Sequence, residues 1–582
     1  MARFLERTAD GMYIVSAPSY RVAVHGHTFD VCVAGNRFCT LDVRTAVPQT
    51  SETLEEIADR ETENPTLVDI AEKTGEVTFT WTGKSDLWNR KTYVLHCDFL
   101  RFTYTVTVAG QGNVDGVQYF AGAGNGSAYE FAGNGSAYEF SEGFTPCVSW
   151  YNEEDYRFRA SMNCHRWSVL MVPPMFSYSF GMRGVGDRLS LGLVAERGEH
   201  NFHAFDYRVV RNSWGSGFYL ATDQSGHTHV DGTWTAPAII GYGAANEDDA
   251  LRKYTDYYFT SGIAKPHDHR PFPRFWYGPM LCGWLEQAMR VGDPAFPEMT
   301  VTELAREDLY EALVGKLAGY DMHPTALIID DKWQSHYATD EADPTKWKDL
   351  RAFVDRRHAE GIHTMLWFKL WDPDGWDPAL CVTTDNGEMR IDPSTPEFLA
   401  NLDRALYRIL SADAGCYDCD GFKLDFAFYN PIGRRVKTHS GKYGVELLYD
   451  MMAYIYKKAK KIKPDALVNC SPCHPYFAHI CDQARLHDYD PKNRDNREDL
   501  EMRGRMFSLA MPGVLLDTDN SGFNTHRDTM RWQMDQAMIG VPDLYALMGN
   551  ESCPLTDEDF LAISAMWKEY ARKIDLLRGM EQ

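Results

Sequence analysis

From about residue 274 to the end of the chain, short apolar segments alternate with longer helical ones, and this alternation limits the fold more than any other feature. Eight strand–helix units in about 300 residues fit a (β/α)8 barrel better than an open sheet. We predict strands near residues 276–284, 326–329, 362–371, 420–428, 466–469, 479–485, 513–516 and 541–546. We predict helices opening at Thr300 and Ser394, and others over 347–360, 443–462, 495–511, 527–538 and 560–577.

The first 260 residues have a different pattern, with short β-rich runs separated by Gly, Asn and Asp turns. Such runs at close spacing are typical of an all-β sandwich. A Pro-rich connector at 265–273 separates this region from the alternating one, so we predict a β-sandwich domain over 1–265 and a catalytic barrel over 274–582. A nine-residue repeat, 123–131 followed by 132–140, reads as a loop or hairpin insertion whose role the sequence does not reveal.

The charge balance excludes several classes of partner. The chain has 59 basic and 83 acidic residues, a formal charge of −24, which repels nucleic acid and anionic membranes and favours neutral or cationic ligands. No apolar run is long enough to span a bilayer, and the N-terminus lacks an apolar stretch of signal-peptide length. We therefore expect a cytoplasmic protein whose 13 cysteines are mostly reduced thiols, and a homo-oligomer is compatible with the sequence.

The segment 420–428 is the most informative of the predicted strands. Phe422, Leu424 and Phe426 alternate with Lys423 and Asp425, so both charges point to the face opposite the apolar side chains. In a barrel strand that face is the interior, and Asp425 lies near the C-terminal end, where (β/α)8 enzymes hold their chemistry. The alternative is a buried ion pair with a purely structural role.

Other predicted strands also end in acids or polar clusters: Asp330 and Asp331 after the second strand, His487 and Asp488 beyond the sixth, and 517–519 after the seventh. Carboxylates that converge from separate strands indicate a hydrolase that uses one ionised and one protonated carboxyl group. Taken singly, each of these acids is equally compatible with a helix N-cap.

Several motifs resemble one family of enzymes. The run 330–334 (Asp-Asp-Lys-Trp-Gln) resembles the D-D-G-W-Q motif, and 421–425 (Gly-Phe-Lys-Leu-Asp) the K-x-D nucleophile strand, of the α-galactosidase and raffinose synthase family of glycoside hydrolases (family 36, clan D). Segments 485–488, 367–368 and 392–397 are similar to that family's Arg-containing acid/base loop, W-F strand and D-x-x-x-P-E helix start. The likeness keeps chain order over residues 274–550.

The resemblance implies a β-supersandwich followed by a (β/α)8 TIM barrel, retaining hydrolysis of terminal α-galactosides in oligosaccharides or glycosides, and no cofactor or metal. It implies Asp425 as the nucleophile and Asp488 as the acid/base, with Asp482 and Asp490 as rivals for the second role. Retention needs the two carboxyl groups about 5–5.5 Å apart. The substrate-binding residues that it implies are Asp330, Asp331, Trp333, Trp367, Lys423, Cys470, Arg485 and His487.

The chain also departs from the family. Lys332 replaces the usual Gly, which puts a long cation beside the sugar-binding acids, and Lys369 and Leu370 stand where many relatives have an acidic run. We expect the family's C-terminal β-domain to be absent. Specificity for galactose is therefore the part of the interpretation that the sequence supports least.

Three metal or haem motifs compete with this interpretation. Segment 470–474 (Cys-Ser-Pro-Cys-His) matches a haem-attachment pattern, and with Cys416 and Cys419 it offers four thiols for zinc. Segment 517–528 resembles a calcium loop. Three other functions also stay open: a catalytically idle sugar-binding barrel, a metal-dependent barrel enzyme acting through Asp517, Asp519 and Asp528, and a transglycosylase of the same family.

Overall fold

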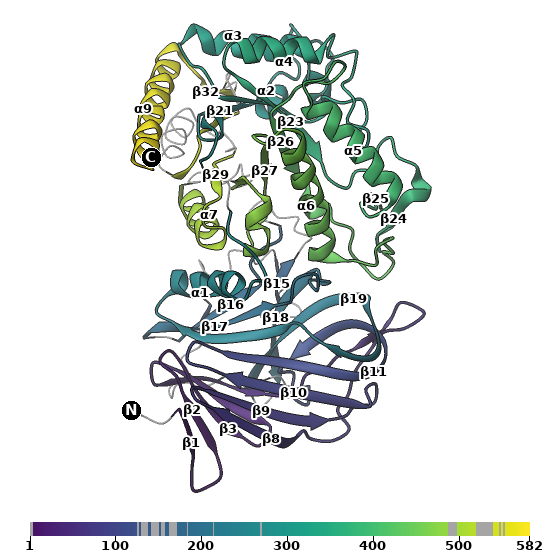
Figure 1. The fold of residues 1–582 in the computed structure, drawn as a ribbon, viewed down its shortest axis with the longest axis vertical. Coiled ribbons are helices and arrows are strands. Elements are labelled where there is room, and N and C mark those ends of the chain that lie inside the picture. Colours follow the sequence, from purple (N-terminus) through teal and green to yellow (C-terminus); the bar gives the residue numbers. More distant parts are fainter. Residues whose placement is uncertain are drawn as a thin grey trace.

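The computed structural model divides into an all-β N-terminal part and a barrel with its surrounding helices, stacked along the long axis of the molecule (Figure 1). It describes residues 4–581 except 125–126, 130–137, 141–149, 153–156, 162–171, 183, 213–214, 268–270, 487–496, 520–538, 546–548 and 551–552. No helix in the described part of the chain is long and apolar enough to cross a membrane.

Every regular element described between Leu5 and Ala244 is a β-strand, and all the pairings are antiparallel. Along β10, buried side chains alternate with more exposed ones, because one face of the sheet packs on the core. The strands are β1 Leu5–Arg7, β2 Tyr13–Ser16, β3 Arg21–His25, β4 Thr28–Val33, β5 Asn36–Asp42, β6 Gln49–Thr50, β7 Glu56–Ile57, β8 Thr66–Lys73, β9 Glu76–Gly83, β10 Arg90–Cys97, β11 Phe102–Tyr119, β12 Ser127–Tyr129, β13 Tyr138–Phe140, β14 Trp150–Asn152, β15 Arg157–Ser161, β16 Ser177–Met182, β17 Val185–Val194, β18 Ala204–Asn212, β19 Gly215–Thr235 and β20 Ala238–Ala244.

One ion-pair group is buried in this all-β part. Lys91 on β10 donates to Asp59 (2.7 Å) and to Glu61 (2.6 Å), and the Lys91 and Asp59 side chains have no exposed surface. A buried cation of this kind is held by its partners, and removing one of them leaves an uncompensated charge.

The second part contains eight parallel strands in the order β29-β28-β27-β26-β23-β22-β21-β30. A parallel bridge between Asp517 and Val541 brings the two ends of this sheet together, so the barrel is nearly closed. The predicted all-β domain followed by a TIM-like barrel is thus confirmed. The strands are β21 Met280–Cys282, β22 Ala326–Ile329, β23 His363–Lys369, β26 Gly421–Asp425, β27 Leu467–Cys470, β28 Gln483–Arg485, β29 Leu515–Asp517 and β30 Asp543–Leu544.

Helices cover the barrel from outside, with α9 along one flank and α6 on the opposite side (Figure 1). The α-helices are α1 Glu247–Thr260, α2 Trp284–Met289, α3 Glu307–Gly319, α4 Leu350–Ala359, α5 Pro396–Leu410, α6 Gly444–Ile462, α7 Arg497–Ala510 and α9 Asp557–Glu581. Short 3-10 helices are η1 Arg274–Trp276, η2 Val301–Leu304, η3 Pro378–Leu380, η4 Ala427–Tyr429 and η5 Pro475–Ile480, and two small hairpins pair β24 Cys381–Thr383 with β25 Met389–Ile391 and β31 Gly549–Asn550 with β32 Cys553–Pro554.

Two predicted helix starts differ in detail. The Glu303 carboxylate does accept from the Thr300 amide (2.8 Å), but this motif opens the short η2 and α3 begins only at Glu307. Thr395 rather than Ser394 caps α5, because the hydroxyl of Thr395 accepts from the Phe398 amide while Ser394 donates to Asp392. The predicted helix at 527–538 lies outside the described residues.

The predicted orientation of β26 is confirmed. Phe422 and Leu424 pack in the large core cluster between barrel and helices, whereas Lys423 reaches Asp330, directly after β22, and Tyr545, directly after β30, across the barrel. The period of two along a strand therefore sends Lys423 and Asp425 inward.

The all-β part is joined by backbone hydrogen bonds to segments that follow the C-terminal ends of β26 and β27. The amides of Val445 and Glu446, at the start of α6, donate to the carbonyls of Phe202 and His200 (2.9 and 3.0 Å). The Cys473 amide donates to the Pro173 carbonyl (2.9 Å). We call these contacts the interdomain seam.

Candidate active site

The carboxylate of Asp425 is held at the C-terminal end of β26 by three donors. Arg485 Nη2 lies 2.8 Å from Oδ1, the Phe426 amide also donates to Oδ1 (2.8 Å), and Trp367 Nε1 donates to Oδ2 (3.0 Å). Its side chain keeps 15% of its surface exposed, whereas Arg485 keeps 1%. Asp425 is thus fixed in orientation and still open on one side.

Arg485 is in turn supported by a buried polar network below the site. Arg485 Nε lies 3.8 Å from Asp519 Oδ2, and the Tyr545 hydroxyl donates to Asp519 Oδ1. Lys423 Nζ donates to the Tyr545 oxygen (3.1 Å) and to Asp330 Oδ2 (2.9 Å). The network connects Lys423 on the fourth strand and Arg485 on the sixth with residues that follow the second, seventh and eighth strands.

Asp330 and Asp331 differ in their surroundings although they are neighbours in sequence. Asp330 is 2% exposed and accepts from Lys423 and from the Cys282 thiol (3.0 Å). Asp331 is more exposed and accepts from the Tyr337 hydroxyl (2.7 Å). Burial raises the pKa of Asp331 to about 6; the charges of Asp330 and Asp425 contribute, while Tyr337 and Lys369 oppose the shift. Of the two, Asp331 is better placed to contact a ligand.

Two lysines lie close to the ring of Tyr337, beside these acids. Lys332 Nζ is 3.8 Å from the ring centroid and Lys369 Nζ is 4.4 Å from it. Each is paired with a carboxylate, Lys332 with Asp374 (2.5 Å) and Lys369 with Asp372 (2.8 Å). The rim of the site therefore carries both signs of charge.

The backbone is strained at three positions around the site. Lys332, Phe426 and Asp519 have φ values of +70°, +61° and +54°, in the left-handed region that side chains other than Gly adopt at a cost. The left-handed φ at Lys332 explains why a Gly suits this position in the resembled family. Such outliers cluster at functional sites.

The other predicted site residues fall into two groups. Trp333 is fully buried and donates its indole N–H to the Trp367 carbonyl (2.8 Å), so it packs behind the strand rather than facing a ligand. Cys470 is also buried, at the C-terminal end of β27. His487, Asp488 and the rival Asp490 lie outside the described residues.

Asp482 does not share the site with Asp425. It precedes β28, at the opposite end of the barrel from Arg485, and accepts from Lys460 (2.7 Å), Tyr456 (3.0 Å) and the Val468 amide (2.8 Å). His267 also lies 3.1 Å from its carboxylate. A buried carboxylate with these partners is a structural group.

Two further buried acids lie near this network. Asp517 was among the acids predicted at strand ends and a candidate metal ligand, whereas Asp543 was not predicted as a site residue. Burial raises the pKa of Asp517 to about 6, and burial together with the Asp517 charge raises the pKa of Asp543. Asn469 on β27 donates to Asp517 (2.6 Å). The signal available for Asp543 was an acid within the predicted strand 541–546, at the inward-facing start of β30.

The structure does not bring together the two cysteine pairs of the candidate zinc site. Cys416 and Cys419 precede β26, whereas Cys470 ends β27 and Cys473 follows it, so the two pairs lie at opposite ends of the barrel. His474 is fully buried and its Nε2 lies 3.2 Å from the Tyr254 hydroxyl at the interdomain seam. Of the predicted calcium loop, only 517–519 belong to the described residues.

A cavity of about 640 Å³ opens where the two parts of the chain meet. Residues that follow Asp425 line one side of it, and the ring of Phe426 stacks on one of them, Tyr429 (4.9 Å between centroids). The remaining lining includes Asp223 from the all-β part and Arg390 and Arg434 from the barrel loops.

Comparison with solved structures places this architecture among known folds. The galactosidase domain of an alpha-galactosidase–sucrose kinase is similar at 12% identity, with 98% of this chain and 86% of that one covered and a TM-score of 0.52. A GH31 family sulfoquinovosidase from E. rectale matches at 12% identity, 94% and 82% coverage and a TM-score of 0.57. A GH31 dextranase from Flavobacterium johnsoniae matches at 10% identity, 98% and 70% coverage and a TM-score of 0.51. The chain shares their fold.

These likenesses do not single out family 36, which the sequence motifs resemble, because GH31 enzymes match the fold as well. No protein-family model matches the sequence. No curated protein matches it either.

Proposed function

We propose that the protein is a retaining exo-glycoside hydrolase that acts on terminal α-galactosyl or similarly configured residues. The observation that carries the proposal is Asp425, fixed by Arg485, Trp367 and its own loop at the C-terminal end of a barrel strand, with one side open. This is where barrel enzymes carry their chemistry. The fold shared with a galactosidase domain, a sulfoquinovosidase and a dextranase supports the reaction class.

In the proposed mechanism Asp425 attacks the anomeric carbon and displaces the leaving-group oxygen, which takes a proton from the acid/base carboxyl group. Water, deprotonated by the same group, then attacks the anomeric carbon and releases Asp425. Asp488 is the acid/base that the sequence motif implies. Arg485 orients the nucleophile, and Asp331 is placed to bind sugar hydroxyls.

The identity of the sugar rests on the sequence motifs, since the structural neighbours are described as acting on different sugars. A panel of aryl glycosides decides it. The proposal expects cleavage of the α-galactoside or a sugar of related configuration, and cleavage of only α-glucosides or only β-glycosides would contradict it.

The roles of the two acids are separated by rescue experiments. Asp425→Gly should be almost inactive even with good leaving groups, and azide should give the inverted glycosyl azide. Asp488→Ala should still react with activated leaving groups, and azide should give the retained product, with a loss of about 10²–10⁴ that grows with leaving-group pKa. Asp575→Asn, an exposed acid on α9, is the control and should keep full activity. Azide rescue at Asp490 instead would reassign the acid/base.

A further inference from the structure

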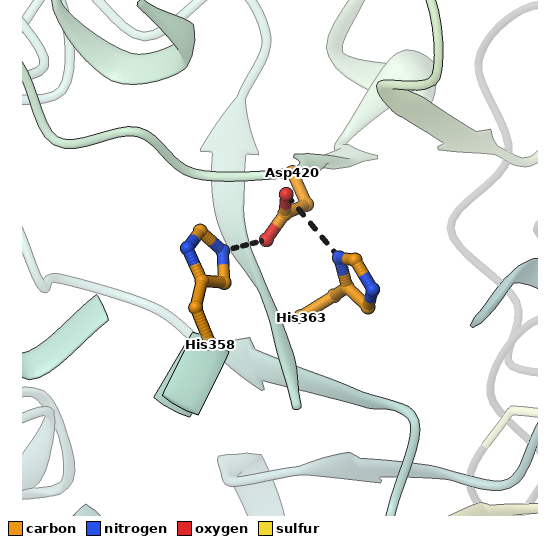
Figure 2. A group of neighbouring side chains, drawn as sticks. All are labelled: His358, His363 and Asp420. Atoms are coloured by element: carbon orange, nitrogen blue, oxygen red, sulfur yellow. Dashed lines mark hydrogen bonds and ion pairs between the residues drawn. The ribbon is translucent and has the colours of Figure 1, made fainter. Parts of the chain in front are cut away.

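Three side chains capable of binding a metal meet at the N-terminal end of the barrel, on the face away from the proposed active site. His358 lies near the end of α4, His363 begins β23, and Asp420 immediately precedes β26. Figure 2 shows both imidazole rings directed at the carboxylate of Asp420 from opposite sides. The group is distinct from every residue used in the proposed reaction.

The donor atoms of the three side chains lie close to one another. His358 Nε2 lies 2.7 Å from Asp420 Oδ2, and His363 Nδ1 lies 3.3 Å from Asp420 Oδ1. One ligand atom from each of the three residues lies within 4.8 Å of the other two. The His363 Nδ1 atom is buried and makes no hydrogen bond of normal geometry, so its lone pair is available in the neutral ring.

The surroundings hold each ligand in place. The Asp420 amide donates to the Thr364 carbonyl (2.7 Å), and its carboxylate accepts from the Thr364 amide (2.9 Å). The His363 ring stacks on Phe275 with 3.9 Å between centroids. His358 Nδ1 lies 3.9 Å from Asp418 Oδ2, a carboxylate in the position from which outer groups orient metal-bound imidazoles.

The exposure of the two histidines and the charges around them are also compatible with a bound metal ion. The His358 and His363 side chains are 27% and 37% exposed, so water can complete the coordination, whereas Asp420 is 8% exposed. Lys463 competes for the carboxylate, since its Nζ lies 3.2 Å from Asp420 Oδ1. Lys463 also donates to Asp418 (2.8 Å) and to the Cys419 carbonyl (2.8 Å), while Asp420 Oδ2 faces His358 and accepts from the Thr364 amide (2.9 Å).

We propose that His358, His363 and Asp420 form a structural binding site for one divalent transition-metal ion, with Zn²⁺ as the best match. Two imidazole nitrogens and one carboxylate oxygen are a donor set that suits Zn²⁺, Ni²⁺ or Co²⁺ and disfavours Mg²⁺ and Ca²⁺, which take oxygen ligands. The ion links α4, β23 and the start of β26. Because it binds the folded chain, it stabilises the barrel by mass action.

The test measures metal binding and melting on the full chain after chelator treatment and dialysis. Titration with ZnCl₂ should show one tight site per chain and raise the melting temperature, and MgCl₂ and CaCl₂ should do neither. His358→Ala and His363→Ala should each weaken Zn²⁺ binding by at least about tenfold and abolish the melting shift. His323→Ala removes an exposed His beside Asp321 in the turn before β22 and should leave both unchanged.

One variant separates this site from a second group of ligands beside it. Asp355 and Asp418 form another candidate group around His358, and that group would survive His363→Ala, so undiminished binding by this variant would overturn the assignment. Lys463→Met removes the competing cation and should tighten Zn²⁺ binding. If the unmodified chain does not bind Zn²⁺ stoichiometrically, the three side chains form only hydrogen bonds with one another and the proposal is refuted. None of these outcomes depends on glycosidase activity.

Discussion

Replacing Asp331 by Asn should stabilise the protein at neutral pH while reducing its activity. Burial raises the pKa of Asp331 to about 6 from an ordinary value of 3.8. The folded chain therefore holds this proton more tightly than the unfolded chain between these two values, and stability falls as the pH rises from about 4 to about 6. Above that window the ionised carboxylate costs the fold up to about 3 kcal/mol, from about two pKa units at about 1.4 kcal/mol each.

Asn cannot ionise, so Asp331→Asn avoids this cost, and its amide oxygen can still accept the Tyr337 hydroxyl. We expect its melting temperature to exceed that of the unmodified protein at about pH 8 and the difference to vanish towards about pH 4. The proposed sugar-binding role predicts a lower kcat/KM at every pH. Thermal melts across this range, with kinetics on the best aryl glycoside, measure both effects.

Asp374→Asn is the matched control with the opposite sign. Burial would raise the pKa of Asp374, but hydrogen bonds from Lys332 and His336 outweigh it and lower the pKa. This group therefore stabilises the fold above its unfolded pKa and loses that effect as the pH falls, so its variant should be less stable at neutral pH. A melting difference for Asp331→Asn that is the same at both ends of the range would refute the reasoning.

Three further substitutions test other parts of the structure. Lys332→Gly should leave melting almost unchanged, because relief of about 1 kcal/mol of left-handed strain offsets the lost ion pair, but it should alter relative rates among sugars; equal loss on all of them would indicate a structural role. Tyr545→Phe should cost about 1–3 kcal/mol and lower kcat/KM, since Asp519 loses a buried donor, and unchanged melting and kinetics would argue against the network. Lys91→Met should cost about 3–5 kcal/mol by leaving buried carboxylates unpaired, and the double variant with Asp59→Asn should recover part of it in thermal melts.

The periodic parts of the sequence predicted the fold well. The segment 326–329 coincides with β22, and the alternation around Lys423 gave the correct facing because a strand has only two faces. Strands that lie next to residues that interrupt regular structure, such as proline, were predicted too long. The segment 276–284 contains a 3-10 turn and a three-residue strand, since Pro279 lacks an amide hydrogen and α2 begins at Trp284.

The site was less predictable than the fold. The motifs brought Asp425, Arg485 and Asp331 together, but they did not show that Trp333 packs behind the strand, because only the turn that follows decides which way an indole points. The link from Tyr545 to Asp519 joins loops after different strands, and no local pattern encodes such a contact. In the sequence, the only signal of the Tyr545–Asp519 contact was the polar character of residues 517–519.

The interdomain seam has a consequence for how this protein can be divided or recombined. Three backbone amides beyond the C-terminal ends of β26 and β27, those of Val445, Glu446 and Cys473, donate to carbonyl groups of the all-β part. A barrel cut free at the Pro-rich connector would expose these amides together with the buried aromatic surface around His474. The all-β part and the barrel therefore differ in architecture but depend on each other for these hydrogen bonds. A chimera that exchanges the all-β part must carry over the matching segments near residues 173 and 200–202.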